Sequence, residues 1–163
     1  MEFAISKRHC GSLIRWRGCR GSFLSQVARD QKKSKTSSIA ACPCGTGRPF
    51  EVCCGPLHAG AIASTAQALM RSRYSAFVLK NEPYLLATWH ARKRPASIPF
   101  DPNTKWLGLE IVDAVENAGE AEVEFIARFR IGGGSAVRLH ERSRFVHETG
   151  RWFYVDGQLR DSK

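Results

Sequence analysis

Four cysteines in the segment ACPCGTGRPFEVCCGP (residues 41–56) constrain this chain more than any other feature of its sequence. Eight residues separate the pair Cys42/Cys44 from the pair Cys53/Cys54. Thiolates bind Zn²⁺ in a tetrahedral shell at about 2.3 Å, and a Cys-x-Cys pair reaches one centre only where the backbone curls tightly. Within the segment, Pro43, Gly45 and Gly47 favour such a curl. We therefore predict a structural zinc site held by all four cysteines; two disulfides, or a loop with incidental thiols, are the alternatives.

The charge of the chain is unevenly distributed along the sequence. Its net charge is +10, but residues 1–40 alone hold nine Lys and Arg against two acidic residues. This segment has no sustained apolar period, so we expect a disordered basic tail. A transit peptide, or residues added by an upstream start, are the alternatives. The remaining chain is nearly balanced in charge, which weakens the argument for a nucleic-acid-binding domain.

Apolar runs and cysteine usage bear on the compartment. No run is long enough for a transmembrane helix, and Arg interrupts the N-terminal segment too often for a secretory signal. We therefore expect a cytoplasmic protein without membrane contact. A reducing compartment favours a metal over disulfides for the clustered cysteines.

The residues after the cysteines predict helices first and strands afterwards. Residues 64–90 are typical of two helices, the first with an apolar stripe through Met70, Tyr74 and Phe77. Pro83 suits the first turn of the second helix. Four predicted strands follow, at Trp106–Val112, Glu122–Ile131, Ala136–His147 and Trp152–Asp156. This order predicts an α+β domain with helices packed on an antiparallel sheet.

Charge pairing predicts the register of the central hairpin. If residues 132–134 form its loop, Glu122 faces Arg144 and Glu124 faces Arg142 across the two strands. The opposite face of the hairpin is then largely apolar, and we expect it to pack against the helices.

Two polar residues, Glu141 and Ser143, interrupt that apolar face. A buried carboxylate is costly without a partner, so a cavity or a buried arginine is implied. The turn before the last strand is ambiguous by one residue. One register brings Tyr154 and Asp156 to the Glu141 face, and the other brings their neighbours there.

The cysteine segment resembles the SEC-C motif, a short zinc module known from the C-terminal end of the SecA translocation ATPase. The matching residues are Cys42-Pro43-Cys44-Gly45, Gly47, Phe50 and Cys53-Cys54-Gly55. The resemblance implies docking of a protein partner such as a chaperone or the ribosome. Members of the SEC-C family usually carry several Lys between the cysteine pairs, where this chain has TGRPFEV.

The later part of the chain, with the motifs MRSRYSAF, YLLATWH, WLGLEIV, ERSRF and RWFYVDG, closely resembles the YchJ family of bacterial proteins. This resemblance covers residues 41 to about 157. It implies a zinc module at 41–57, a cone-shaped nuclear transport factor 2-like domain at 62–157 and a tail at 158–163. In that superfamily a curved antiparallel sheet and helices enclose a pocket. The fold alone does not imply a reaction.

Within such a pocket, Glu141 or Asp156 would accept a proton while Tyr74 and His90 orient a small substrate. The superfamily geometry lays the first helix across the concave face, so we expect Glu141 within hydrogen-bonding distance of Arg71 or Arg73. The alternative is that these groups only hold the helix to the sheet. The residues expected to support the pocket are Arg71, Arg73, Ser143, Trp89 and Trp106.

These observations favour a non-catalytic binding or adaptor protein that docks a protein or ribosome-associated partner. The alternative is an enzyme or small-ligand binder with isomerase- or hydrolase-like proton-transfer chemistry. Direct RNA contact through Arg48, the tail and residues 91–95 has charge but no stacking platform, and ranks last.

Overall fold

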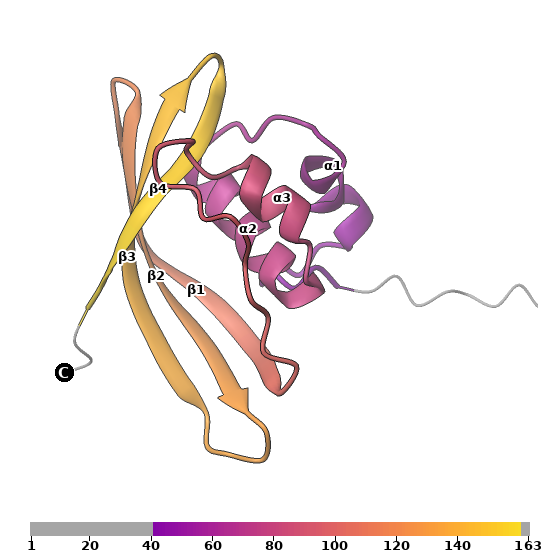
Figure 1. Cartoon of the computed structure of the whole chain (residues 1–163). Helices are drawn as coiled ribbons and strands as arrows, with labels where there is room; N and C mark the ends of the chain where they lie inside the picture. Colours follow the sequence, from indigo (N-terminus) through magenta and orange to yellow (C-terminus); the bar gives the residue numbers. More distant parts are fainter. Residues whose placement is uncertain (1–40, 161–163) are drawn as a thin grey trace, which may run out of the picture. The chain divides into compact units, whose positions relative to one another are not determined.

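The computed structural model describes residues 41–160 of the chain (Figure 1). The predicted basic tail at 1–40 and residues 161–163 lie outside this part. The described elements are η1 (Phe50–Val52), α1 (Gly55–His58), α2 (Ala66–Leu79), α3 (Glu82–Ala87), β1 (Thr104–Asn117), β2 (Glu120–Ile131), β3 (Val137–Glu148) and β4 (Arg151–Leu159). None of these helices is long and apolar enough to cross a membrane.

The four strands form one antiparallel sheet in the order β1-β2-β3-β4, and the helices lie on one of its faces (Figure 1). The sheet curves around the helices, so it has a concave and a convex face. Leu107 and Val112 in β1 are left unpaired at register shifts, as is Val155 in β4. Such bulges bend a strand and increase its twist. The predicted α+β class, with helices on a curved antiparallel sheet, is confirmed.

Helix α2 carries the apolar stripe that the sequence predicts. Thr65 caps its start by accepting a hydrogen bond from the Ala68 backbone at 3.0 Å. Lys80, with a φ of 56°, ends the helix in the left-handed conformation. The buried core joins this helix to β2 and β3, through Leu69, Met70, Tyr74, Val123, Phe125, Ala127 and Phe145.

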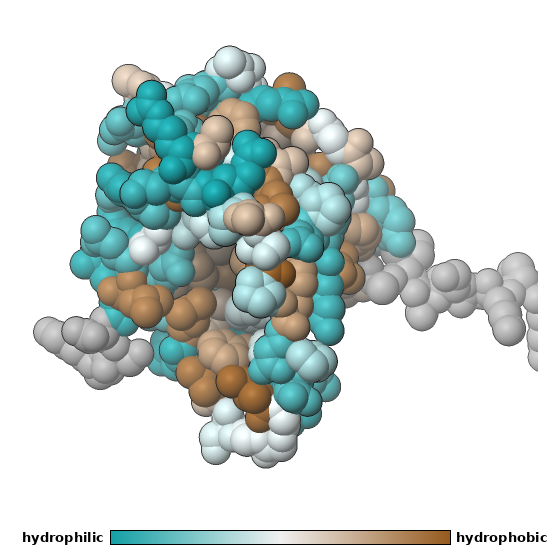
Figure 2. All heavy atoms as spheres, in the orientation of Figure 1, coloured by the Kyte–Doolittle hydropathy of each residue, from teal (hydrophilic) through white to brown (hydrophobic). Residues whose placement is uncertain are grey.

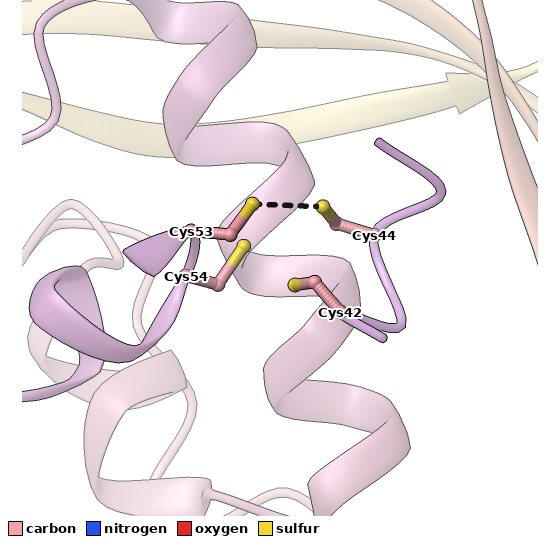
Figure 3. Close-up of side chains that lie close together, drawn as sticks. All are labelled: Cys42, Cys44, Cys53 and Cys54. Carbon is pink, nitrogen blue, oxygen red and sulfur yellow. Dashed lines mark hydrogen bonds between the residues drawn. The ribbon is translucent and has the colours of Figure 1, made fainter. Parts of the chain in front are cut away.

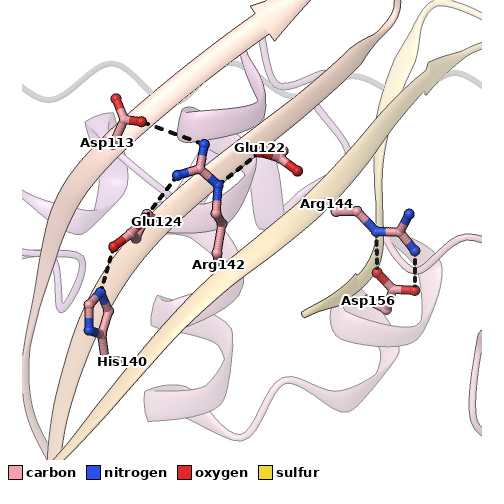
Figure 4. A network of polar contacts seen from close by, with 7 residues as sticks. All are labelled: Asp113, Glu122, Glu124, His140, Arg142, Arg144 and Asp156. Atoms are coloured by element: carbon pink, nitrogen blue, oxygen red, sulfur yellow. Dashed lines mark hydrogen bonds and ion pairs between the residues drawn. The ribbon is translucent and has the colours of Figure 1, made fainter. Parts of the chain in front are cut away.

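The register of the central hairpin is as predicted. Glu122 lies opposite Arg144, and Glu124 lies opposite Arg142. On the convex face, Arg142 donates to Glu122 at 2.8 Å and to Glu124 at 2.9 Å (Figure 4). The strands separate earlier than predicted, which leaves residues 132–136 between them.

The turn between β3 and β4 has two residues, Thr149 and Gly150. Both have positive φ angles, 51° and 77°, as in the type I′ turns that join tightly paired strands. This turn places Tyr154 opposite Phe145, on the concave face.

The bulge at Val155 then reverses the alternation of side chains along β4. Asp156 therefore lies opposite Arg144 and faces the convex side. Before the bulge, Tyr154 lies on the Glu141 face, as one of the two predicted registers requires. After the bulge, Asp156 lies on the other face, as the second register requires. The strand continues to Leu159, two residues past the predicted end of the domain.

Candidate metal centre and cavity

The sulfur atoms of Cys42, Cys44, Cys53 and Cys54, called here the cysteine cluster, all lie within 4.8 Å of one another (Figure 3). All four are free thiols, and only Cys53 is partly exposed. In a tetrahedral shell of zinc–sulfur bonds of about 2.3 Å, the sulfur atoms are about 3.8 Å apart. The spacing and the donor type both fit, so the cluster could hold a metal ion.

Backbone contacts curl the chain around the cluster. The Cys42 N–H donates to the Arg48 carbonyl at 2.8 Å, which closes the loop that carries the first pair. Gly45 has a φ of 81°, and a Cβ there would lie 3.1 Å from the Leu109 carbonyl. Both features favour glycine. The second pair lies between the short helices η1 and α1.

The thiols of the cluster influence one another's ionisation. The hydrogen bond from the Cys54 thiol, helped by the Thr46 hydroxyl, holds the pKa of Cys44 well below its usual range. The same bond and burial raise the pKa of Cys54. One thiolate therefore forms readily, while further thiolates need a cation that offsets their mutual repulsion.

Arg71 joins the cysteine cluster to helix α2. Its Nη1 donates a hydrogen bond to the Cys44 carbonyl at 2.9 Å. The sequence suggested Arg71 or Arg73 as a partner for Glu141, but positions two apart lie about 200° around a helix. Only Arg73 therefore faces the sheet, and the expectation that Arg71 supports the pocket is corrected.

His58 makes a second connection between the cysteine segment and α2. Its Nε2 donates to the Ser72 carbonyl at 2.9 Å and lies 3.1 Å from Ser75 Oγ. Its ring packs against Tyr84, with centroids 4.4 Å apart. Burial lowers the pKa of His58, which favours the neutral ring. Sequence reasoning missed this residue, since a single histidine after the second pair has no motif spacing.

A second candidate site is a cavity of about 230 Å³ between α2, the segment after α3 and the concave face of the sheet. In the space-filling view a hollow opens between the helices and the sheet (Figure 2). Tyr154, whose face the sequence left open, lines the cavity. The structure also brings together there these sequence-predicted residues: Arg73, Tyr74, Trp89, Trp106, Glu141 and Ser143.

Arg73 is only 3% exposed, and it fixes the end of helix α3. Its Nη1 donates to the Leu85 carbonyl at 2.8 Å and to Thr88 Oγ1 at 2.7 Å. Its Cζ lies 4.5 Å from the ring centroid of Tyr154 and 5.1 Å from that of Trp89. Burial lowers the pKa of Arg73 to about 10, so the group stays charged at neutral pH.

Glu141 lies on the concave face but does not make the expected hydrogen bond to an arginine. Its Oε1 accepts from Ser143 Oγ at 2.6 Å and from the Tyr154 hydroxyl at 3.5 Å. Within residues 41–160, neither Arg71 nor Arg73 forms an ion pair with it. The Arg73 guanidinium donates to the end of α3 instead, because the last carbonyls of a helix lack hydrogen-bond donors within the helix.

Gly157 leaves room for the carboxylate of Glu141. It pairs with Ser143, and a Cβ added at position 157 would overlap the carboxylate. Burial, followed by the charge of Glu141, raises the pKa of Tyr154. The hydrogen bond from Ser143 and the absence of a side chain at Gly157 thus set the position of the Glu141 carboxylate.

Asp156 and His90, both predicted at the pocket, lie outside it. Asp156 accepts two hydrogen bonds from Arg144, at 2.7 and 2.6 Å, on the convex face (Figure 4). The bulge at Val155 turns it away from the cavity. His90 Nε2 lies 3.4 Å from a carboxylate oxygen of Glu148, near the β3–β4 turn.

Two family models match the chain. Residues 65–157 match the model described as "YchJ, middle NTF2-like domain", and residues 40–56 match the SEC-C motif. Both matches confirm the resemblances drawn from the sequence.

Individual relatives cover most of the described chain. A UPF0225 protein from Polaromonas sp. (strain JS666) is 57% identical over 131 residues, covering 74% of this chain and 94% of the relative. A UPF0225 protein from Xanthomonas campestris pv. campestris is 52% identical, covering 77% of this chain and 99% of the relative. The solution structure of a SEC-C motif containing protein from Rhodopseudomonas palustris is similar in fold, with a TM-score of 0.67 and 37% identity. It covers 75% of this chain and 100% of its own.

Proposed function

The chain belongs to the family of YchJ-like UPF0225 proteins, and we propose that it is a non-catalytic binding protein that docks a protein partner, ribosome-associated proteins included. A structural zinc ion in the cysteine cluster would hold the docking surface in shape. The proposed setting is the reducing cytoplasm, where free thiolates persist.

The composition of the cluster favours a structural role for the metal. Four thiolates complete a tetrahedral shell, whereas catalytic zinc sites keep one position open for water or substrate. The residues that hold the ion would be Cys42, Cys44, Cys53 and Cys54. The metal would link the two ends of the cysteine loop, and Arg71 and His58 would transmit that order to helix α2.

The observation that carries the docking proposal is an apolar groove beside the cysteine segment. This α3 groove, of about 290 Å³, lies between residues 57–63, helix α3 and the start of β4. Ile62 on its rim is 55% exposed, and Tyr84 and Trp152 line it. Aromatic and aliphatic side chains in a concavity are typical anchors for a segment of a protein partner.

Charge favours a protein over RNA as the partner of this surface. In the cysteine loop, the guanidinium of Arg48 donates to the Val52 carbonyl at 2.7 Å. Among the described residues that line the groove, the one Lys or Arg is Arg151, whose guanidinium lies 3.5 Å from the Gly60 carbonyl. RNA binding relies on several available cations along one surface.

The docking proposal is tested with an affinity-tagged full-length chain purified from bacterial lysate after nuclease treatment. We expect a partner protein at a fixed ratio with the wild type, and its loss with Ile62→Asp. Val137→Asp is the matched control, since Val137 is similarly exposed (46%) and lies outside the groove. Equal retention by both variants, or a partner protein that is retained only when the nuclease treatment is omitted, would contradict the proposal.

A further inference from the structure

The cavity contains a buried cation with unused donors. A guanidinium has five N–H donors, and both hydrogen bonds of Arg73 within residues 41–160 leave from Nη1. Its Nε and Nη2 thus remain available, although the residue is only 3% exposed and lines the cavity. A planar pair of such donors matches the two oxygens of a carboxylate.

The same cavity contains an anion with an unused acceptor. Glu141 accepts its two hydrogen bonds through Oε1, and Oε2 has no hydrogen-bond partner in the described chain. Tyr154 separates the two charges, since its ring contacts Arg73 and its hydroxyl contacts Glu141. Opposite charges thus line one cavity without pairing, which is costly unless a ligand or water completes them.

The walls between these charges are aromatic and aliphatic. Tyr74, Trp89, Trp106 and Phe125 line the cavity, and these rings suit a flat apolar body. Its volume of about 230 Å³ is below the range for drug-sized ligands, so it fits a molecule of on the order of ten non-hydrogen atoms.

We propose that this cavity binds a small amphoteric molecule with an apolar body, an anionic carboxylate at Arg73 and a hydrogen-bond donor such as an ammonium group at Glu141. The carboxylate of the ligand would accept from the free guanidinium donors, and its donor group would satisfy the free Oε2 at the same time. The simplest member of this class is an α-amino acid with an aromatic side chain. This binding would be independent of metal occupancy and of the α3 groove.

Three probes that share one apolar body test the proposal: L-phenylalanine carries both groups, 3-phenylpropionate only the carboxylate, and phenethylamine only the ammonium group. Binding is followed by NMR through the indole N–H signals, assigned with Trp→Phe variants of the full chain. We expect saturable shifts for Trp89 and Trp106 and none for Trp152, which lines the α3 groove. L-Phenylalanine should bind at least about tenfold more tightly than either single-charge probe, equivalent to about 1.4 kcal/mol.

Variants test which residue binds the ammonium group of the ligand. Glu141→Gln keeps the shape of the side chain and should weaken L-phenylalanine about tenfold while leaving 3-phenylpropionate unchanged. Gly157→Ala should do the same by displacing the carboxylate. Asp156→Asn is the control, since that carboxylate lies on the convex face and should not matter. Circular dichroism of each variant establishes that it is folded.

Three results would overturn the proposal. One is the absence of saturable shifts at Trp106 with all three probes at millimolar concentration. Another is equal affinity for L-phenylalanine and 3-phenylpropionate. The third is an unchanged affinity for L-phenylalanine in both folded variants, Glu141→Gln and Gly157→Ala.

Discussion

The guanidinium of Arg73 lies over the ring of Tyr154, with 4.5 Å between Cζ and the ring centroid. Because the tyrosine hydroxyl reaches Glu141 at 3.5 Å, the aromatic ring stands between the two opposite charges of the cavity. The hydrogen bonds of Arg73 run to the end of α3 instead. Arg73 therefore joins two helices, while Glu141 depends on Ser143 and Tyr154.

Replacing Arg73 by Met should destabilise the fold by roughly 3 kcal/mol, because the buried Leu85 carbonyl and the Thr88 hydroxyl lose a charged donor. Urea denaturation measures the loss. Arg144→Met is the matched control: this arginine is exposed on the convex face, where ion pairs contribute little. Equal losses in the two variants would show that Arg73 does not hold α3.

Gly157→Ala should destabilise the protein, because the added methyl group overlaps the carboxylate of Glu141. In the double variant with Glu141→Ala, the overlap disappears and part of the stability should return. A double-mutant cycle by thermal or urea unfolding should give a coupling of about 1 kcal/mol or more. Strictly additive effects would mean that the two side chains do not compete for the same space.

Much of the sheet could be predicted because charges mark its convex face. Glu122 lies opposite Arg144, and Glu124 lies opposite Arg142. Only one register of the hairpin allows these pairs and also keeps the apolar residues of both strands on one face. No comparable pattern in the sequence of β4 indicates that Val155 is left unpaired. Alternation alone therefore could not show that Tyr154 and Asp156 face opposite sides.

The site was predicted less completely than the fold. The cysteine spacing predicted a four-sulfur site, and the structure brings those sulfur atoms together. The partner of Glu141 could not be predicted, because the competing acceptors on α3 become visible only when the helices are packed. The role of Arg71 follows from its helical phase, but only once the cysteine segment is known to pack against α2.

Stability should fall as the pH drops below neutrality, in part through His58. Burial lowers the pKa of this histidine from its ordinary value of 6.5, so the unfolded chain binds the proton more readily than the folded one. The contribution is therefore fully present above about pH 6.5 and is lost as the pH falls through the folded-state pKa.

The measurement is the urea midpoint of the wild type and of His58→Gln between pH 7.5 and pH 5.5. The cysteine cluster is common to both proteins, so the difference between their slopes reports on position 58. We expect a shallower slope for His58→Gln. Parallel slopes would show that His58 binds its proton equally well in the folded and unfolded chains.

The proposed structural role of the cysteine cluster depends on its metal content. Metal analysis and native mass spectrometry of the full chain, purified under reducing conditions, should give one zinc ion per chain. Cys53→Ser should lose the zinc, because three thiolates no longer complete the shell. Cys10→Ser is the control and should retain the zinc, since Cys10 is not one of the four cysteines of the cluster. Wild-type protein without zinc, with all four cluster thiols titrating freely, would contradict a structural zinc site.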